Sequence, residues 1–169
     1  SLPTHASTTI AKGLPEGREV KRIGEILTTS SRGTPNRGEF SNYGGAINWF
    51  KTGELKQMYI FDSEEKISES GVENSSAKIF PAGTVVMAMY CAMDNVSILG
   101  KPSATNQACC AFLPKHNSTP SLFTYYLIKF NITQLIAYAH GAAQQNLSQD
   151  LIKKHRVFLP QHQIIKSFS

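Results

Sequence analysis

The sequence predicts an α+β domain in which a twisted mixed β-sheet of several short strands packs against two to three helices. Apolar runs too short for ordinary helices recur between turn residues in the first two thirds of the chain, which is typical of strands. Apolar residues at helical spacing follow only after Pro120, so the helices come after most of the strands. At 169 residues, the chain is long enough for one domain with a substantial core.

Residues 75–114 are expected to form the centre of the sheet. Residues 84–91 are nearly all apolar and predict a strand that is buried on both faces. Residues 96–99 and 107–113 predict two further strands, the second of which is bounded by Pro114. Polar residues gather where these strands begin and end, and such edges are where a rigid scaffold presents binding side chains.

Shorter elements are expected before this central sheet. Residues 18–27 predict an extended segment that finishes as one helical turn. Residues 46–50 and 57–61 predict strands, and residues 67–74 predict a short helix that stops near Gly71.

Residues 30–45 predict a long loop that is rich in Gly, Asn and Ser. Loops of this length in compact domains are usually functional or disordered. The arginines Arg32 and Arg37 and the aromatic residues Phe40 and Tyr43 favour a functional loop.

The pattern after the sheet predicts two helices that meet at Asn131. Thr119 is expected to cap the first helix, with Pro120 at its first position. The apolar phase breaks at Asn131, which with Gln134 resembles a capping box, and Gly141 closes the second helix. The last expected elements are a short helix at residues 149–155, capped by Ser148, and a final strand at residues 157–159.

Composition and charge limit the classes of partner and compartment. The net charge of +5 and the pI near 9.2 favour a polyanionic partner, but many basic domains bind no nucleic acid. No apolar run approaches the ~20 residues of a membrane span. The first residues are polar and Thr-rich, unlike a signal peptide, so we expect a cytoplasmic protein without a membrane partner.

The three cysteines are Cys91, Cys109 and Cys110. An odd count with two adjacent members is not a secreted disulfide framework. Adjacent residues on a strand point to opposite faces, which opposes shared metal ligation. We therefore expect buried, reduced cysteines, with a zinc site as the remote alternative.

Residue patterns of catalysis are missing from the sequence. It contains no P-loop, no G-x-G-x-x-G, no H-E-x-x-H and no Cys/His set with metal-ligand spacing. The five histidines have no acidic or nucleophilic partner beside them in the sequence. We expect no catalytic residue, no metal and no cofactor.

Six short segments form a set of motifs: SSAK at residues 75–78, FPAGTVVMAMY at 80–90, TNQACC at 105–110, GAINWFKTGEL at 45–55, GAAQQNLS at 141–148 and VFLP at 157–160. Together they resemble the target recognition domain of type I restriction-modification specificity subunits. The resemblance covers roughly residues 15 to 162, in order and at family-like spacing. Tyr90 is followed by Cys91, where the family commonly has glycine.

The resemblance implies a target-recognition-domain fold and sequence-specific binding to one half of a bipartite double-stranded DNA target. Methylation and restriction subunits would be the partners and would carry out the chemistry. Residues 16–162 would be the recognition domain. Residues 1–15 would be a linker or the end of a preceding helix, and 163–169 the truncated start of a connecting helix. The chain is then a fragment or a half-length subunit. The alternative is a protein-interaction module that keeps the scaffold without reading DNA.

DNA recognition requires cations for phosphates and hydrogen-bonding groups for base edges. The expected phosphate contacts are Arg32, Arg37, Lys51, Lys78 and Lys101. The expected base-edge contacts are Asn36, Asn42, Gln57 and Asn106, with Tyr43 and Tyr90 as flat contact surfaces and Ser76 as a further DNA-binding candidate.

Several of these candidates have a simpler alternative. Lys51 and Lys101 lie beside turns, where a lysine is more often a solvated charge. Ser76 could bond turn backbone, and either Asn106 or Gln107 is expected to satisfy backbone groups. Trp49 is expected in the core. The basic cluster at residues 153–156 is either a solvated helix end or a surface for DNA or the methylation subunit.

Overall fold

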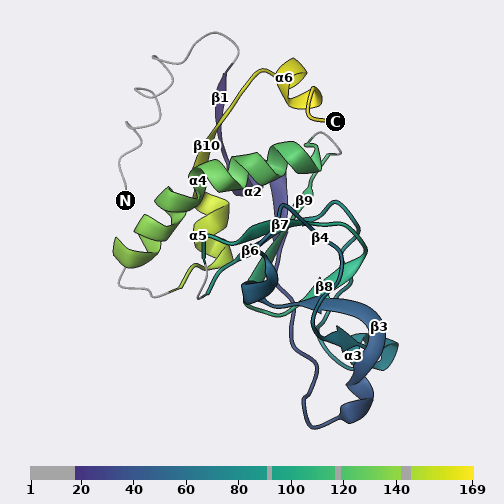
Figure 1. Ribbon diagram of the computed structural model, residues 1–169. Coiled ribbons are helices and arrows are strands. Elements are labelled where there is room, and N and C mark those ends of the chain that lie inside the picture. The colour runs from purple at the N-terminus through teal and green to yellow at the C-terminus, as the bar shows by residue number, and fades with distance from the viewer. Residues whose placement is uncertain (1–17, 91–92, 117–118, 142–145) are drawn as a thin grey trace.

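The computed structural model describes residues 18–90, 93–116, 119–141 and 146–169 (Figure 1). The strands are β1 (Glu19–Arg22), β2 (Leu27–Ser30), β3 (Tyr43–Phe50), β4 (Tyr59–Ile60), β5 (Lys66–Ile67), β6 (Val85–Ala88), β7 (Val96–Leu99), β8 (Ser103–Thr105), β9 (Cys109–Pro114) and β10 (Arg156–Leu159). The helices are α2 (Ile23–Ile26), α3 (Glu69–Glu73), α4 (Ser121–Gly141), α5 (Gln149–Lys154) and α6 (His162–Lys166), with short 3-10 turns η1 (Phe40–Asn42) and η2 (Thr52–Glu54).

The strands form three sheets that mix parallel and antiparallel pairs. The central sheet has the order β2-β9-β6-β7-β4, in which only the β4–β7 pair is parallel. A second sheet has the order β5-β3-β8, and β1 pairs with β10. Together with the helices these sheets confirm the predicted α+β class. The expected strands at 84–91, 96–99 and 107–113 are β6, β7 and β9, with shorter bounds at each end of β6.

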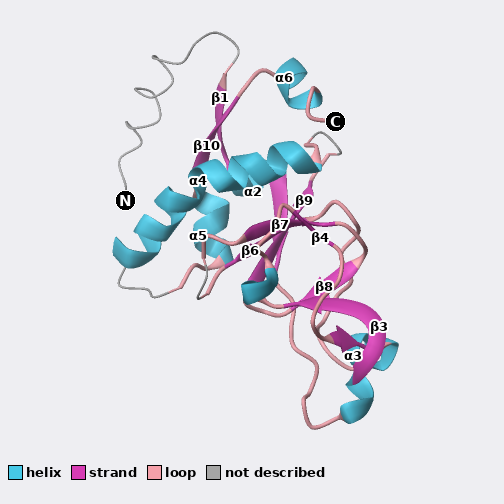
Figure 2. Cartoon of the chain, viewed as in Figure 1, coloured by secondary structure: helices cyan, strands magenta, loops and turns pink. Residues whose placement is uncertain are grey.

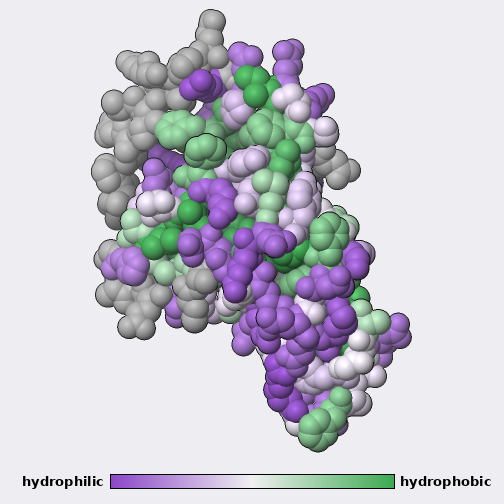
Figure 3. Space-filling model, viewed as in Figure 1, coloured by the Kyte–Doolittle hydropathy of each residue, from purple (hydrophilic) through white to green (hydrophobic). Residues whose placement is uncertain are grey.

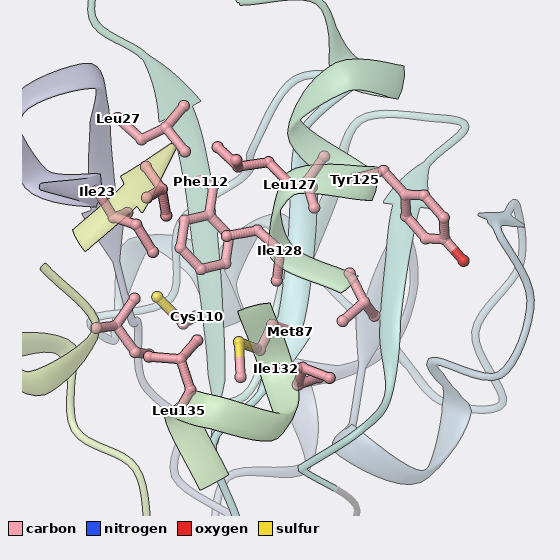
Figure 4. Packing of buried hydrophobic residues seen from close by; sticks show 14 of the residues in the cluster. Ile23, Leu27, Met87, Cys110, Phe112, Tyr125, Leu127, Ile128, Ile132 and Leu135 are labelled. Carbon is pink, nitrogen blue, oxygen red and sulfur yellow. The ribbon is translucent and has the colours of Figure 1, made fainter. Parts of the chain in front are cut away.

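The central sheet has a separate apolar cluster on each face. On one face, Met87 and Phe112 point towards α4 and pack with Ile128 and Leu135 (Figure 4). On the other face, Cys109 joins a cluster that includes Phe50, Leu55, Phe80 and Val86. Cys110 belongs to the α4 side, so the two adjacent cysteines are buried on opposite faces, as predicted. Cys91 lies outside the described residues.

A smaller lobe projects from this body (Figure 2). It contains the sheet of β3, β5 and β8 together with η1 and α3. Its own core consists of Trp49, Ile67, Ala77 and Ala104. Trp49 is therefore a core residue, as predicted, but it belongs to the lobe and not to the central sheet.

The short helix of the lobe was predicted to stop near Gly71, and this prediction is wrong. Helix α3 continues to Glu73, with Gly71 in its middle. A Cβ atom at Gly71 would clash with the backbone carbonyl oxygen of Asn42. The glycine therefore serves the close packing of α3 against η1 and does not end the helix.

The prediction of two helices meeting at Asn131 is also wrong, because α4 is continuous from Ser121 to Gly141. The Asn131 Nδ2 group donates to the carbonyl oxygen of Leu127, one turn earlier, over 2.8 Å. This backward bond leaves the helix unbroken, whereas a cap would bond forward to start a new one. Thr119 does not cap α4 either, since its buried hydroxyl has no hydrogen-bond partner in the described part of the chain.

Other local predictions are confirmed. Residues 18–27 form β1 followed by the single turn of α2. The Ser148 hydroxyl accepts a hydrogen bond from the Leu151 backbone N–H over 3.2 Å and caps α5. None of the described helices combines the length and the apolar character that a bilayer crossing requires.

Candidate nucleic-acid interface

Three of the segments that connect body and lobe, residues 31–34, 75–78 and 106–107, are joined by hydrogen bonds, and we call these three segments the neck. The Ser31 hydroxyl donates to the carbonyl oxygen of Gln107 over 2.6 Å, and the Thr34 hydroxyl donates to the side-chain oxygen of Gln107. The backbone N–H of Gly33 donates to the carbonyl oxygen of Ser76 over 3.4 Å. The loop after β2 is thus joined to the segments that carry two of the family-like motifs.

Two of the predicted phosphate contacts, Arg32 and Lys78, lie on the neck. Both are exposed, and within the described residues neither side chain has a hydrogen bond or an ion pair. Arg32 directly precedes Gly33 and Lys78 follows Ser76 by two positions, so the Gly33–Ser76 bond brings the two segments together. A cation without an internal partner can neutralise a phosphate without first losing an ion pair.

The other three predicted phosphate contacts are paired with carboxylates. Arg37 donates to both carboxylate oxygens of Glu65, and the longer bond is 3.0 Å. The Lys51 ammonium lies 3.6 Å from the same carboxylate, and the Lys101 ammonium lies 3.4 Å from Asp62. The hydrogen bonds from Arg37 hold the pKa of the Glu65 carboxyl below its ordinary value, so Glu65 is charged at neutral pH.

Aromatic rings lie under the Arg37 guanidinium. Its carbon atom is 4.5 Å from the ring centre of Tyr43 and 5.2 Å from that of Trp49. The two rings meet edge to face at 6.2 Å. The Tyr43 hydroxyl donates to the carbonyl oxygen of Pro35 over 2.6 Å, and burial raises the pKa of this phenol. Arg37 is therefore held by a carboxylate at its end and by two rings at its face.

Two predicted base-edge residues stabilise the loop before β3. Asn42 is only 2% exposed, and its Nδ2 group donates to the carbonyl oxygen of Asn36 over 3.2 Å. The Asn36 side chain is exposed, and its oxygen accepts from the backbone N–H of Gly38 over 2.9 Å. Asn42 is thus turned into the lobe, while Asn36 lies at the surface.

Of the remaining predicted contacts, Asn106 and Ser76 lie on the neck, whereas Gln57 and Tyr90 do not. The Asn106 side-chain oxygen accepts from the backbone N–H of Ala108 over 3.1 Å, which confirms that one residue of the Asn106–Gln107 pair satisfies backbone. The Gln57 side chain is exposed, and Tyr90 is half-buried. The Ser76 side chain is exposed and lies beside Gly33. A Cβ atom at position 33 would clash with the Ser76 hydroxyl.

The sequence did not indicate Glu65 as a member of this site. It is 28 residues away from Arg37 along the chain and stands in an acidic stretch that is typical of a solvated turn. A pair of opposite charges at that separation has no local signature, so only the fold reveals the pairing. The Ser63 hydroxyl donates to the carbonyl oxygen of Glu65 over 2.6 Å and accepts from the backbone N–H of Trp49 over 3.0 Å, which fixes this turn against β3.

The basic cluster at residues 153–156 is divided by the fold. Lys154 pairs with Asp150 over 2.7 Å, one turn earlier in α5. His155 is buried and bonds to Asn131, whereas Lys153 and Arg156 are exposed. Among the residues that the structure describes, no three His, Cys, Asp or Glu side chains are placed to hold a metal ion.

Relatives among known proteins are specificity subunits. The chain is 32% identical to the MjaIX type I restriction enzyme specificity subunit of Methanocaldococcus jannaschii over 119 residues, which are 69% of this chain and 27% of that protein. It is 23% identical to the HindI specificity subunit of Haemophilus influenzae over 158 residues, 92% of this chain and 34% of that protein. The chain therefore spans about a third or less of these relatives.

Solved structures share the fold. The S subunit from M. genitalium superposes with a TM-score of 0.69 at 16% identity, covering 98% of this chain and 41% of that one. The HsdS subunit from Thermoanaerobacter tengcongensis gives a TM-score of 0.67 at 15% identity over 92% of this chain and 36% of that one. The model of the type I restriction modification DNA specificity domain matches residues 15–169. The chain belongs to this family of DNA specificity domains.

Proposed function

We propose that this domain recognises DNA sequence and reads one half of a bipartite target for a type I restriction-modification complex. Its family and its relatives among specificity subunits support DNA recognition. The observation that carries the proposal is that two exposed cations on the neck, Arg32 and Lys78, have no hydrogen bond or ion pair among the residues that the structure describes. They adjoin a lobe whose visible surface is hydrophilic along one side and hydrophobic at its tip (Figure 3).

In this proposal the neck and the lobe lie along the duplex. Arg32 and Lys78 contact phosphates and set the register, because phosphate contacts position a protein without carrying sequence information. The exposed side chains of Asn36, Gln57 and Ser76 are the candidates for contacts to base edges. The half-buried Asn106 could add its amide nitrogen, since its oxygen accepts from Ala108, and the ring of Tyr90 could pack flat against the DNA. The domain itself is non-catalytic, and methylation and restriction subunits supply the chemistry at the addressed site.

The first experiment measures binding of fluorescent duplexes to the chain by anisotropy at several salt concentrations. Arg32→Ala and Lys78→Ala are each expected to weaken binding to all duplexes and to reduce the salt slope by about 1. Lys166→Ala is the matched control, because Lys166 is also exposed and α6 lies at the opposite end of the molecule (Figure 1). An equal loss in the control would contradict a specific role for the neck.

The second experiment tests the half-target. The domain is placed in a complete specificity subunit of the family, which is co-expressed with its methylation subunit, and modified adenines are mapped by sequencing. One half of the methylated motif is expected to change with the domain. Methylation that does not depend on the domain, together with salt-indifferent or absent DNA binding, would favour the protein-interaction module.

A further inference from the structure

Only some of the N–H donors of the Arg37 guanidinium are engaged by described residues. Of the five N–H donors of an arginine, two are engaged by Glu65, and the other three have no partner among the described residues. The side chain is nonetheless 55% exposed. A planar donor group of fixed orientation is therefore presented at the surface of the lobe.

The orientation of this group is set from several sides. Glu65 fixes the guanidinium end through two hydrogen bonds, and Tyr43 and Trp49 lie under its face. Tyr43 is itself held by its hydrogen bond to Pro35, and Trp49 is 2% exposed. Little side-chain freedom is left to lose on binding, which favours directional recognition over a loose contact.

The combined charge of Arg37, Lys51 and Glu65 still attracts an electronegative ligand. Arg37 and Lys51 share the single carboxylate of Glu65, so the three side chains together carry one net positive charge. An exposed cation such as Arg32, which no described residue holds, can follow a phosphate, whereas Arg37 cannot move without leaving Glu65 and the rings. A fixed planar donor suits the planar edge of a base.

We propose that Arg37 recognises a guanine of the half-target by donating hydrogen bonds to its O6 and N7 in the major groove, the acceptor pair that arginine matches best. Glu65, Tyr43 and Trp49 are positioning residues that hold the guanidinium for this contact. The proposal rests on the proposed function and refines the earlier prediction of Arg37 as a phosphate contact.

The test uses the same complete specificity subunit with its methylation subunit and compares the methylated motifs of variants. Arg37→Lys is expected to relax one G·C position by roughly tenfold to a hundredfold and to leave the other positions unchanged. Glu65→Gln is expected to relax the same position by less, since the arginine remains but loses its charged support. Asp150→Asn is the matched control, because it neutralises a carboxylate that pairs with an exposed cation in α5.

Two outcomes would overturn the proposal. If Arg37→Lys relaxes an A·T position or no position, Arg37 does not read guanine. If Glu65→Gln strengthens binding to all duplexes equally and leaves the motif unchanged, Glu65 competes with phosphates and does not position a reader. If Arg37→Lys abolishes methylation altogether, binding of duplexes to the purified variant chain is measured by anisotropy instead, and thermal melting checks that the variant is folded. The same two outcomes then apply to duplex binding. Failure of the half-target proposal would be seen separately: the methylated motif would not change when the wild-type domain is placed in the specificity subunit.

Discussion

Asn131 in α4 and His155 at the end of α5 are joined by a hydrogen bond of 2.9 Å between Oδ1 and Nε2. Because the Asn131 amide nitrogen donates to Leu127, its oxygen is the acceptor, and His155 therefore donates from Nε2. The His155 carbonyl oxygen accepts from the backbone N–H of Ile23 over 2.9 Å. One buried histidine thus ties α2, α4 and α5 together.

This arrangement predicts a loss of stability as the pH falls. Burial lowers the pKa of His155 below its ordinary value of 6.5, and its buried Nδ1 atom has no partner in the described structure. The unfolded chain binds a proton near pH 6.5 while the folded chain stays neutral, so stability is highest above that pH and declines below it. Urea unfolding from pH 8 to 5 measures the decline. The same series on His155→Gln should lose this component, and an unchanged profile would contradict the assignment.

The partner residue is predicted to matter at neutral pH. Asn131→Ala removes the acceptor for His155 and leaves its buried N–H unsatisfied, which should cost about 1–3 kcal/mol of unfolding free energy. Thr133→Ala on the same helix is the control, since Thr133 is exposed. Urea unfolding at pH 7.5 compares the two variants, and equal stabilities would argue against the buried bond.

The contact between α3 and η1 predicts an inverted effect of a glycine substitution. Replacing glycine by alanine within a helix usually stabilises by roughly 0.5–1 kcal/mol. Gly71→Ala is instead expected to destabilise by about 1–3 kcal/mol, because its Cβ would meet the backbone of Asn42. Gly53→Ala is the control, because a Cβ there meets nothing within 4 Å. Chemical unfolding of both variants provides the comparison.

Truncation of two phenylalanines to alanine is expected to change the stability by very different amounts. Phe112 is 1% exposed in the core under α4, and Phe112→Ala should cost about 3–5 kcal/mol. Phe40 is 89% exposed, so Phe40→Ala should change stability by less than about 0.5 kcal/mol. Thermal melting distinguishes them. A large loss for Phe40→Ala would mean that this ring is covered in solution.

The adjacent thiols of Cys109 and Cys110 are predicted to be unreactive towards alkylating reagents in the folded chain. Burial raises the pKa of both the Cys109 and the Cys110 thiol to about 12, so the reactive thiolate is scarce at neutral pH. In a Cys91→Ser variant, iodoacetamide at pH 8 should label neither thiol until urea is added. Mass spectrometry gives the count, and rapid labelling without urea would show that β9 opens readily.

The parts of the fold that the sequence predicted correctly have local signals. The apolar runs of β6, β7 and β9 are bounded by turn residues, and Ser148 stands one position before the helix that it caps. The prediction of a helix boundary at Asn131 was wrong because an asparagine side chain can either cap a new helix or donate to a backbone carbonyl one turn earlier in the same helix. The choice depends on His155, which lies 24 residues later.

The candidate site was predicted less completely for the same reason. Residue type and loop position indicated Arg32 and Lys78, and both are exposed without partners in the described chain. The difference between them and Arg37 depends on Glu65 and on the rings beneath the guanidinium, which only the fold assembles. Asn42 has the same side chain as Asn36, and only its burial separates their roles.

The small core of the lobe has an evolutionary consequence. Trp49, Ile67, Ala77 and Ala104 share no member with either apolar cluster of the central sheet. Exposed residues of the lobe can therefore diverge while the scaffold keeps its folding energy. Selection could retarget such a domain through substitutions confined to the exposed residues of the lobe.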